Sequence, residues 1–353
     1  HTRTTFTDDG EFMLVGTYRD GYSYLCKAHV PTGDLTTLCD PIKSDGLAIN
    51  PSTLAPKSGW TFFWDGGTLR SINIHTLEER VVIKDIGHEW AGSLMSVDPE
   101  EKFVVSAIGM KNPDELAGLP KDQVRNYKVV FAEGKGLTSK LVQAPIEGGE
   151  PEVVFVDEGV KLCHVEHNPV DGDLFYLDRD RPPMFHAGGD GSKTSRCWTL
   201  KLSTGELTAL TPAAEAKFQI HAAWSWDGEF LLYHGPAKLV WGPCPWYIGA
   251  IRKDGTPYRE WTFPEGTHYG HVASAPDRPA IIIDGNLSPN LLQWLYYDGE
   301  KPRIEPICEH NTELNTVPNN QLSHAHPSTD RQGRWVGFNV AKDKRTFVHV
   351  VEV

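Results

Sequence analysis

The chain has 353 residues, of which 39% are hydrophobic and 23% charged, with a formal net charge of −13 and a pI near 5.6. It has no run near the ~18 apolar residues that a membrane span needs. It also has no basic tract that could follow a phosphate backbone, which argues against nucleic acid as a partner. An anionic ligand must therefore be met by locally placed arginine, histidine or metal, because the overall field repels it.

The cysteines are scattered, with no C-x-x-C pair: Cys26, Cys39, Cys163, Cys197, Cys244 and Cys308. In a chain of this length the pattern predicts buried free thiols and a reducing, cytoplasmic compartment. Because the sequence opens without Met, a removed address is an alternative, and a secreted or periplasmic location stays open.

A short polar turn followed by apolar strands recurs along the chain at a spacing of roughly 50 residues. The strands are rich in Val, Ile, Phe, Tyr and Trp, with turn residues between them. In chain order the seven copies begin at TDDGEFMLVG, INPSTLAPKSGWTFFW, SVDPEEKFVVSAIG, HNPVDGDLFYLD, SWDGEFLLYHG, APDRPAIIID and TDRQGRWVGFNV.

The only candidate helix, NPDELAGLPKDQVRNYK at 112–128, lies within the third copy and indicates an inserted loop over 110–128. Radially repeated four-stranded sheets form a β-propeller, which leaves only short, protected sheet edges. TIM-barrel and Rossmann folds are excluded because helices do not alternate with the strands. The sequence therefore predicts an all-β, seven-bladed β-propeller that forms a single domain over residues 1–353.

Histidines recur shortly before the polar turn in the fourth to seventh copies. They are His164, His221, His271, and the doublet His324 and His326. Loops at one phase of the repeat converge on one end of the channel, so these imidazoles are predicted to meet there. If the doublet is extended, both of its rings lie on one face.

Gln321, three residues before His324, adds a carbonyl oxygen to this group. Three imidazoles and one neutral oxygen leave coordination positions open for solvent or substrate, as in catalytic metal sites. By ligand softness alone, such a site suits zinc, iron, nickel or copper.

The stretch QLSHAHPSTD resembles the Gln-x-x-His-x-His-Pro-Ser metal signature of the oligogalacturonate lyases, the seven-bladed propeller enzymes of polysaccharide lyase family 22. FTDDGEFMLVGTYRDGYSYL and LRSINIHTLEERVVI resemble the first two blades of that family. HAAWSWDG resembles a segment that usually reads His-Glu-Phe-Trp. The resemblance extends along nearly the whole chain.

By matched position, the resemblance implies a Mn²⁺ site made by His271, Gln321, His324 and His326, with His268 as a less favoured rival of His271. The implied activity is pectin-type lyase chemistry, in which a 4-linked uronide is cleaved by β-elimination to a 4,5-unsaturated uronate.

In the same resemblance, His221 matches the base and Arg196 matches an arginine at the substrate carboxylate, although Arg196 also fits a surface arginine between strands. His164 matches a further histidine on the channel face and is a candidate for binding substrate. Trp224 and Trp226 fit blade packing, with sugar stacking by Trp224 as an alternative.

The chain departs from the family pattern beside the expected site. LDRDRPPMF stands where the family commonly shows a Cys-His-Glu-Gly-Pro-like stretch, and Ala222 and Ala223 replace Glu-Phe. Arg179 and Arg181, in the first of these stretches, are candidates for binding the carboxylate of a different uronide. The reaction type is retained, whereas the sugar and the oligomeric state stay open.

Two other functions are compatible with a propeller. A non-enzymatic binding module would carry Gly-His and Trp-Asp dipeptides in most blades if it were of the WD type. Here the single Trp226-Asp227 precedes a turn glycine instead. A metal-dependent hydrolase or epimerase of another acidic sugar would use the same site and yield a saturated product.

Overall fold

The computed structural model of the chain describes residues 5–43, 52–84, 90–91, 95–111, 137–180, 195–210, 219–237, 244–266, 270–285, 290–313 and 323–353. In these residues the structure contains strands and turns and no α-helix. The helix predicted over 112–128 lies outside the described residues.

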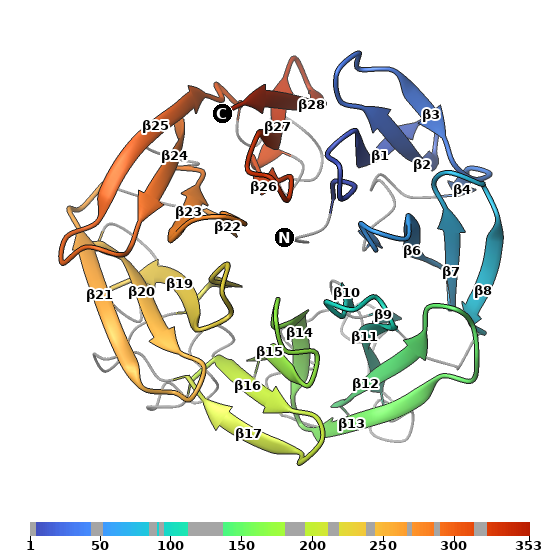
Figure 1. Ribbon diagram of the computed structural model, residues 1–353, viewed down its shortest axis with the longest axis horizontal. Helices are drawn as coiled ribbons and strands as arrows, with labels where there is room; N and C mark the ends of the chain where they lie inside the picture. The colour runs from blue at the N-terminus through green and yellow to red at the C-terminus, as the bar shows by residue number, and fades with distance from the viewer. Residues whose placement is uncertain are drawn as a thin grey trace, which may run out of the picture.

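Seven sheets, each built from consecutive strands, stand in a ring around a common axis (Figure 1). The predicted seven-bladed β-propeller is therefore confirmed. The strands of blades 1 to 3 are β1 (Phe12–Arg19), β2 (Tyr22–His29), β3 (Leu35–Thr37), β4 (Ile42–Lys43), β5 (Ser52–Leu54), β6 (Trp60–Asp65), β7 (Thr68–Asn73), β8 (Glu79–Ile83), β9 (Trp90–Ala91), β10 (Ser96–Val97), β11 (Phe103–Lys111), β12 (Leu137–Pro145) and β13 (Glu152–Glu158).

Blades 4 to 6 each have four antiparallel strands, and blade 7 has three in the part of the chain that the structure describes. Their strands are β14 (Lys161–His167), β15 (Leu174–Asp180), β16 (Cys197–Lys201), β17 (Glu206–Ala209), β18 (His221–Trp224), β19 (Phe230–Pro236), β20 (Trp246–Arg252), β21 (Pro257–Phe263), β22 (Val272–Ser274), β23 (Ala280–Ile283), β24 (Leu291–Tyr296), β25 (Arg303–Glu309), β26 (Ser328–Thr329), β27 (Trp335–Lys342) and β28 (Arg345–Glu352).

The recurring polar turn joins the innermost strand of a blade to the second strand. In blade 5, the Ser225 hydroxyl donates to Asp227 at 2.6 Å and accepts from the Phe230 amide at 2.9 Å. Gly228 has a φ of +71°, and a Cβ there would lie 2.3 Å from Oδ1 of Asn168 in blade 4. The Asn168 amide donates to the Gly228 carbonyl at 2.7 Å. Glycine is therefore required at a turn that also fixes one blade against its neighbour.

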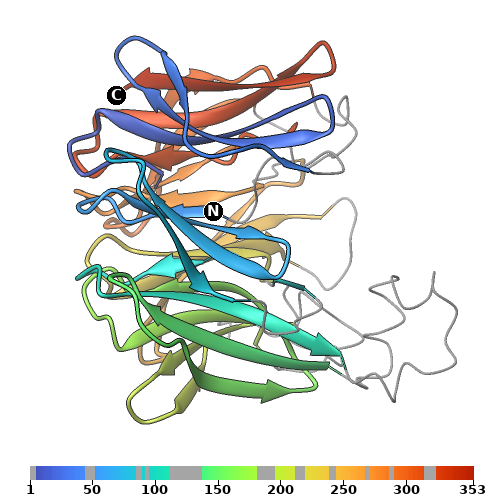
Figure 2. The ribbon, with the colours of Figure 1, turned by 90° about the vertical axis from the view of Figure 1, so that its right-hand side faces the viewer.

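The hydrophobic core is divided into clusters that lie largely between adjacent blades. One cluster joins blades 5 and 6 through residues such as Leu232, Ile248 and Ile283. Another closes the ring, because Phe6 of the first segment packs with Trp335 of blade 7. Viewed edge-on, the connecting turns gather along the two rims of the ring (Figure 2). This packing holds the inner strands, and the side chains at their ends, in fixed positions around the channel.

Two further expectations concern the whole chain. All six cysteines are free, as their spacing predicted. Among the described residues, no helix has the length and apolar character needed to cross a bilayer.

Candidate active site

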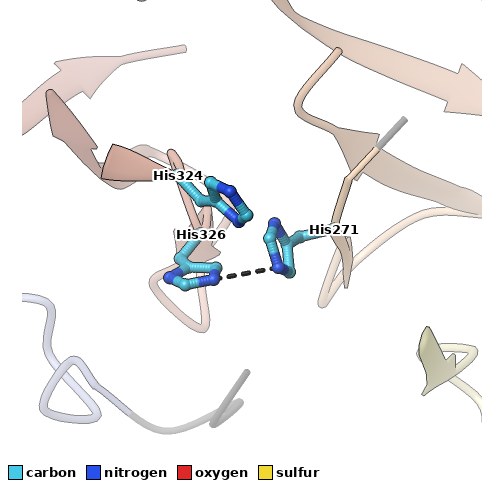
Figure 3. A group of neighbouring side chains, drawn as sticks. All are labelled: His271, His324 and His326. Atoms are coloured by element: carbon cyan, nitrogen blue, oxygen red, sulfur yellow. Dashed lines mark hydrogen bonds between the residues drawn. The ribbon is translucent and has the colours of Figure 1, made fainter. Parts of the chain in front are cut away.

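Three imidazoles from blades 6 and 7, which lie just before the inner strands β22 and β26, face one another (Figure 3). One ring nitrogen from each of His271, His324 and His326 can be chosen so that all three lie within 4.8 Å of one another. The Nε2 atoms of His271 and His326 are 2.9 Å apart. Two nitrogens bound at a right angle, each about 2.0–2.1 Å from one ion, would lie about 2.9 Å apart. The spacing therefore fits neighbouring ligands of one cation, and we call these three residues the metal triad.

A buried aspartate sets the tautomer of His271. The residue lies just before β22, and its Nδ1 is 2.9 Å from Oδ2 of Asp284, which follows β23. The backbone amides of Gly270 and His271 donate to the other carboxylate oxygen at 3.0 and 2.9 Å. Because a carboxylate oxygen accepts, Nδ1 carries the proton and Nε2 carries the lone pair that a metal needs. Burial raises the pKa of Asp284 despite these amide contacts.

His324 and His326 precede β26 and do not form the extended pair that the sequence suggested. His326 has a φ of +45°, in the left-handed region, so the expectation of an extended doublet is wrong. The turn nevertheless presents both rings to His271, with ring centroids 5.2 Å and 3.9 Å away. A left-handed non-glycine residue is strained, and such strain is concentrated at functional sites.

The metal triad has the protonation state that metal binding requires. Burial lowers the pKa of His324, and burial together with neighbouring histidines lowers the pKa of His271 and His326 well below the ordinary value. Neutral imidazoles are the form that coordinates a cation. The donor set therefore fits a divalent metal. Two other residues of the expected set, Gln321 and His268, lie outside the described residues.

His221, the first residue of β18, lies beside the triad. Its ring centroid is 4.7 Å from that of His271, and its Nδ1 is 2.7 Å from the carbonyl oxygen of Gly270. A carbonyl only accepts, so Nδ1 donates and Nε2 carries the lone pair. Burial, followed by the neighbouring His271, lowers the pKa of His221 well below its ordinary value. The ring is therefore neutral and fixed in the tautomer that accepts a proton at Nε2.

His164 continues the arc of histidines into blade 4. It is the extra residue of a bulge in β14, between Cys163 and Val165, with a φ of +21°. Its Nδ1 is 2.5 Å from Oδ2 of the buried Asp178, and its ring centroid is 5.6 Å from that of His221. Bulges commonly re-aim a side chain beside a functional site. Here the bulge directs the ring into the channel.

Arg196 lies beneath this arc and not at the channel surface. It is 3% exposed, with Nη1 2.6 Å from Asp178 and Nε 2.7 Å from Asp180. Nη1 also donates to the carbonyl oxygen of Ile220, the residue before His221. Although burial opposes both shifts, these ion pairs hold the pKa of Asp178 below and that of Arg196 well above its ordinary value. The expectation that Arg196 contacts a substrate carboxylate is corrected, since its guanidinium is already paired and buried.

A cavity of about 320 Å³ fills the channel, lined by the inner strands of blades 2 to 7. It extends from His164 and His221 to Trp226, in the turn after β18. Trp226 is 41% exposed, whereas Trp224 is fully buried and donates its indole N–H to the Glu166 carbonyl at 3.3 Å. The interpretation of Trp224 as a sugar-stacking residue is therefore wrong, and Trp226 is the indole that faces the cavity.

Arg179, another candidate for binding a substrate carboxylate, lies between two blades and not with these histidines. Arg179 forms a two-point ion pair with Asp157, at 2.6 and 3.0 Å, and its guanidinium lies 4.5 Å from the ring centroid of Trp198. These contacts join blades 3 and 4, so Arg179 has a packing role and not the expected role at a substrate carboxylate. Arg181 lies outside the described residues.

No protein-family model matches the sequence, and no curated protein matches it. Among solved structures, an oligogalacturonate lyase in complex with manganese superposes with a TM-score of 0.77 at 19% identity, over 99% of this chain and 88% of that chain. An oligogalacturonate lyase from Vibrio parahaemolyticus gives a TM-score of 0.76 at 18% identity, over 99% of this chain and 89% of that chain. This chain has the fold of the oligogalacturonate lyases.

The same fold occurs in proteins of other kinds. A chain of the mitotic checkpoint complex superposes with a TM-score of 0.63 at 10% identity. The resemblance seen in the sequence is thus confirmed at the level of architecture. Because one fold hosts many functions, the chemistry has to be argued from the side chains at the channel end.

Proposed function

We propose that this chain is a metal-dependent lyase that cleaves 4-linked uronides by β-elimination and leaves a 4,5-unsaturated uronate. One observation carries the proposal. His221 is a neutral histidine of fixed tautomer, and its ring centroid lies 4.7 Å from that of His271. His271 is one of three histidines that are suited to bind a divalent cation. A lyase needs a base for a carbon-bound proton, and the proton-accepting Nε2 of His221 can supply one beside the triad.

The chemistry follows from the weakness of the acid. The C5 proton of a uronide is α to its carboxylate, and a free imidazole does not remove it at a useful rate. His271, His324 and His326 would hold a divalent cation, which would stabilise the negative charge on the substrate carboxylate. His221 accepts the C5 proton at Nε2, while the Gly270 carbonyl holds its Nδ1–H and prevents the ring from turning.

The two similar structures indicate which metal and which substrate to test first. The two similar structures are named oligogalacturonate lyases, one of them in complex with manganese. We therefore propose Mn²⁺ as the metal to supply first, and oligogalacturonate as one member of a substrate panel that also holds 4-linked glucuronides. In a protein of net charge −13, a cation bound at the triad would provide local positive charge for an acidic oligosaccharide.

The test follows the ultraviolet absorbance of the conjugated product. Purified protein is incubated with each uronide, alone, with a chelator, and with chelator followed by excess Mn²⁺. The expected result is a rise in absorbance that the chelator abolishes and Mn²⁺ restores. His221→Gln is the control, because it places a polar amide of similar size there but removes the base. A flat trace across the panel would contradict the proposal, and a saturated product would favour a hydrolase or epimerase.

A further inference from the structure

Elimination also needs a proton for the oxygen that leaves C4, and His221 enters the step neutral, with its one N–H bonded to the Gly270 carbonyl. We propose that His164 donates this proton from the same face of the sugar as His221, which selects uronides with the C5 hydrogen and C4 oxygen on one face, the gluco configuration. This inference rests on the proposed lyase function and names its substrate class.

The order of groups along the channel matches the order of atoms in the substrate. Passing from blade 6 to blade 4, the ring of His271 is followed by that of His221 at 4.7 Å and that of His164 at 5.6 Å. Along a uronide, the carboxylate carbon is followed by C5 with its hydrogen and then by C4 with its oxygen. With the carboxylate beside the triad, His221 lies at C5 and His164 lies at the leaving oxygen.

The environment of His164 suits a proton donor. Its Nδ1 is held by Asp178 at 2.5 Å, so the other nitrogen, Nε2, is the atom that exchanges a proton with a ligand. Asp178 is fully buried and paired with Arg196 at 2.6 Å, which keeps the carboxylate ionised beside the ring. His164 also lines the cavity, so its ring borders the space that a leaving sugar would occupy.

The backbone is built to place this ring. A strained φ of +21° and a strand bulge at one residue are costly, and they persist where the surrounding structure enforces them. An uninterrupted inner strand would keep strict alternation and leave this position without an extra side chain. The bulge therefore adds a side chain to the channel wall next to His221.

The distance between the rings of His164 and His221 indicates that both approach the sugar from the same face. Their centroids are 5.6 Å apart, with an angle of 80° between the planes. Carbon atoms in contact are about 3.5–4.0 Å apart, so a sugar held between two rings would separate them by about 7–8 Å. The sugar therefore cannot lie between them, and both histidines approach it from one side. In galacturonate the C5 hydrogen and C4 oxygen lie on opposite faces, whereas in glucuronate they lie on the same face.

The step balances without another reactant. His221 takes the C5 proton, the C5–H electron pair becomes the C4=C5 double bond, and the C4–O bond breaks. His164 gives its Nε2 proton to the departing oxygen, which leaves as a sugar hydroxyl. Exchange with solvent then returns the proton from His221 and restores the one on His164.

The first experiment needs only the unaltered protein. Matched 4-linked glucuronide and galacturonide oligomers are compared by initial rate of unsaturated product, with Mn²⁺ supplied. We expect kcat/KM to be at least about tenfold higher for the glucuronide. A preference for the galacturonide would overturn the inference while leaving the lyase proposal intact. No product from any uronide would instead remove the lyase proposal itself.

The second experiment separates a proton donor from a merely structural residue. His164→Gln should lose about 10²–10⁴-fold in kcat with a sugar leaving group. It should recover most of that loss with a nitrophenyl ether at C4, whose oxygen leaves without protonation. His221→Gln is the matched control and should show no such recovery. Equal loss by His164→Gln with both leaving groups would overturn the assignment.

Thermal unfolding and Mn²⁺ titration of both variants establish that they are folded and bind metal. If His164→Gln does not fold, the unaltered protein still provides a test through a series of C4 aryl ethers. Proton donation predicts that the rate depends weakly on the acidity of the leaving phenol. A steep dependence would mean that no group protonates the oxygen, and would overturn the inference.

Discussion

Two histidine–aspartate pairs flank His221, and they differ in what surrounds the carboxylate. In blade 4, His164 faces Asp178 at 2.5 Å, and in blade 6 His271 faces Asp284 at 2.9 Å. Both carboxylates are fully buried. Both lie at or just after the end of the second strand of their blade, close to the inner-strand histidine.

The carboxylates have opposite electrostatic environments. Asp284 is met by backbone amides, and burial raises its pKa. Asp178 also meets Arg196, and despite burial this guanidinium, with His164, lowers its pKa. The same pairing thus serves two purposes. Asp284 fixes the tautomer of His271 and directs its Nε2 to the other two rings of the triad, whereas Asp178 joins His164 to the buried guanidinium of Arg196.

The largest effect is expected from removing the ring between the two pairs. His221→Gln should lower kcat for uronide cleavage by about 10²–10⁴-fold, because the base is lost. Mn²⁺ affinity, measured by titration calorimetry, should stay unchanged, because His221 is not a member of the triad. Turnover close to that of the unaltered protein would show that another group removes the C5 proton.

Replacing Arg196 should remove the cation that distinguishes the His164–Asp178 pair from the His271–Asp284 pair. Arg196→Leu leaves Asp178 and Asp180 buried without their cation, and breaking a buried ion pair in this way costs about 3–5 kcal/mol. Urea denaturation measures the loss in the free energy of unfolding. Arg19→Leu is the control, because its side chain is exposed and its pair with Asp20 at 3.6 Å should contribute less than about 1 kcal/mol. Similar losses in both variants would show that the Arg196 network does not stabilise the blade.

Asp284 and Asp178 are expected to affect different properties, namely metal binding and turnover. Asp284→Asn should weaken Mn²⁺ binding by about 10–100-fold, since the carboxylate that orients His271 is lost. Asp178→Asn should leave Mn²⁺ affinity within about twofold, because His164 is outside the triad, while kcat falls. If both substitutions weakened metal binding equally, the distinction between the pairs would fail.

The sequence was sufficient for the fold and for the grouping of histidines, for one physical reason. Turn residues and alternating strands repeat with a period, and residues at one phase of a closed ring must meet. The residues His164, His221, His271 and His326 were therefore predictable as neighbours.

The supporting residues were harder to foresee because their roles depend on burial. No local sequence feature marks Arg196 as buried. Trp224 and Trp226 are only two residues apart, yet Trp224 is buried in the core and Trp226 is exposed. Asp178 and Asp284 did leave a signal, in the strand endings FYLDRD and IIID. Second strands end at the same rim as the histidines, so a polar residue there was a candidate partner.

The smallest effect concerns a histidine three positions beyond His164 that is paired with a hydroxyl and not with a carboxylate. His167 is buried, its Nδ1 is 3.0 Å from the Ser96 hydroxyl, and burial lowers its pKa to about 3. The unfolded chain, with an ordinary pKa near 6.5, binds this proton first as the pH falls. Stability from the neutral ring is thus complete above about pH 6.5 and is lost progressively toward pH 3.

Between pH 7.5 and 5.5 this group alone should lower the free energy of unfolding by about 1.4 kcal/mol. The decrease measured by urea denaturation should be smaller by that amount in His167→Gln, which keeps a polar side chain but does not titrate. Equal pH dependence of both proteins, or an NMR titration of His167 near pH 6.5, would show that burial alone does not keep the ring neutral.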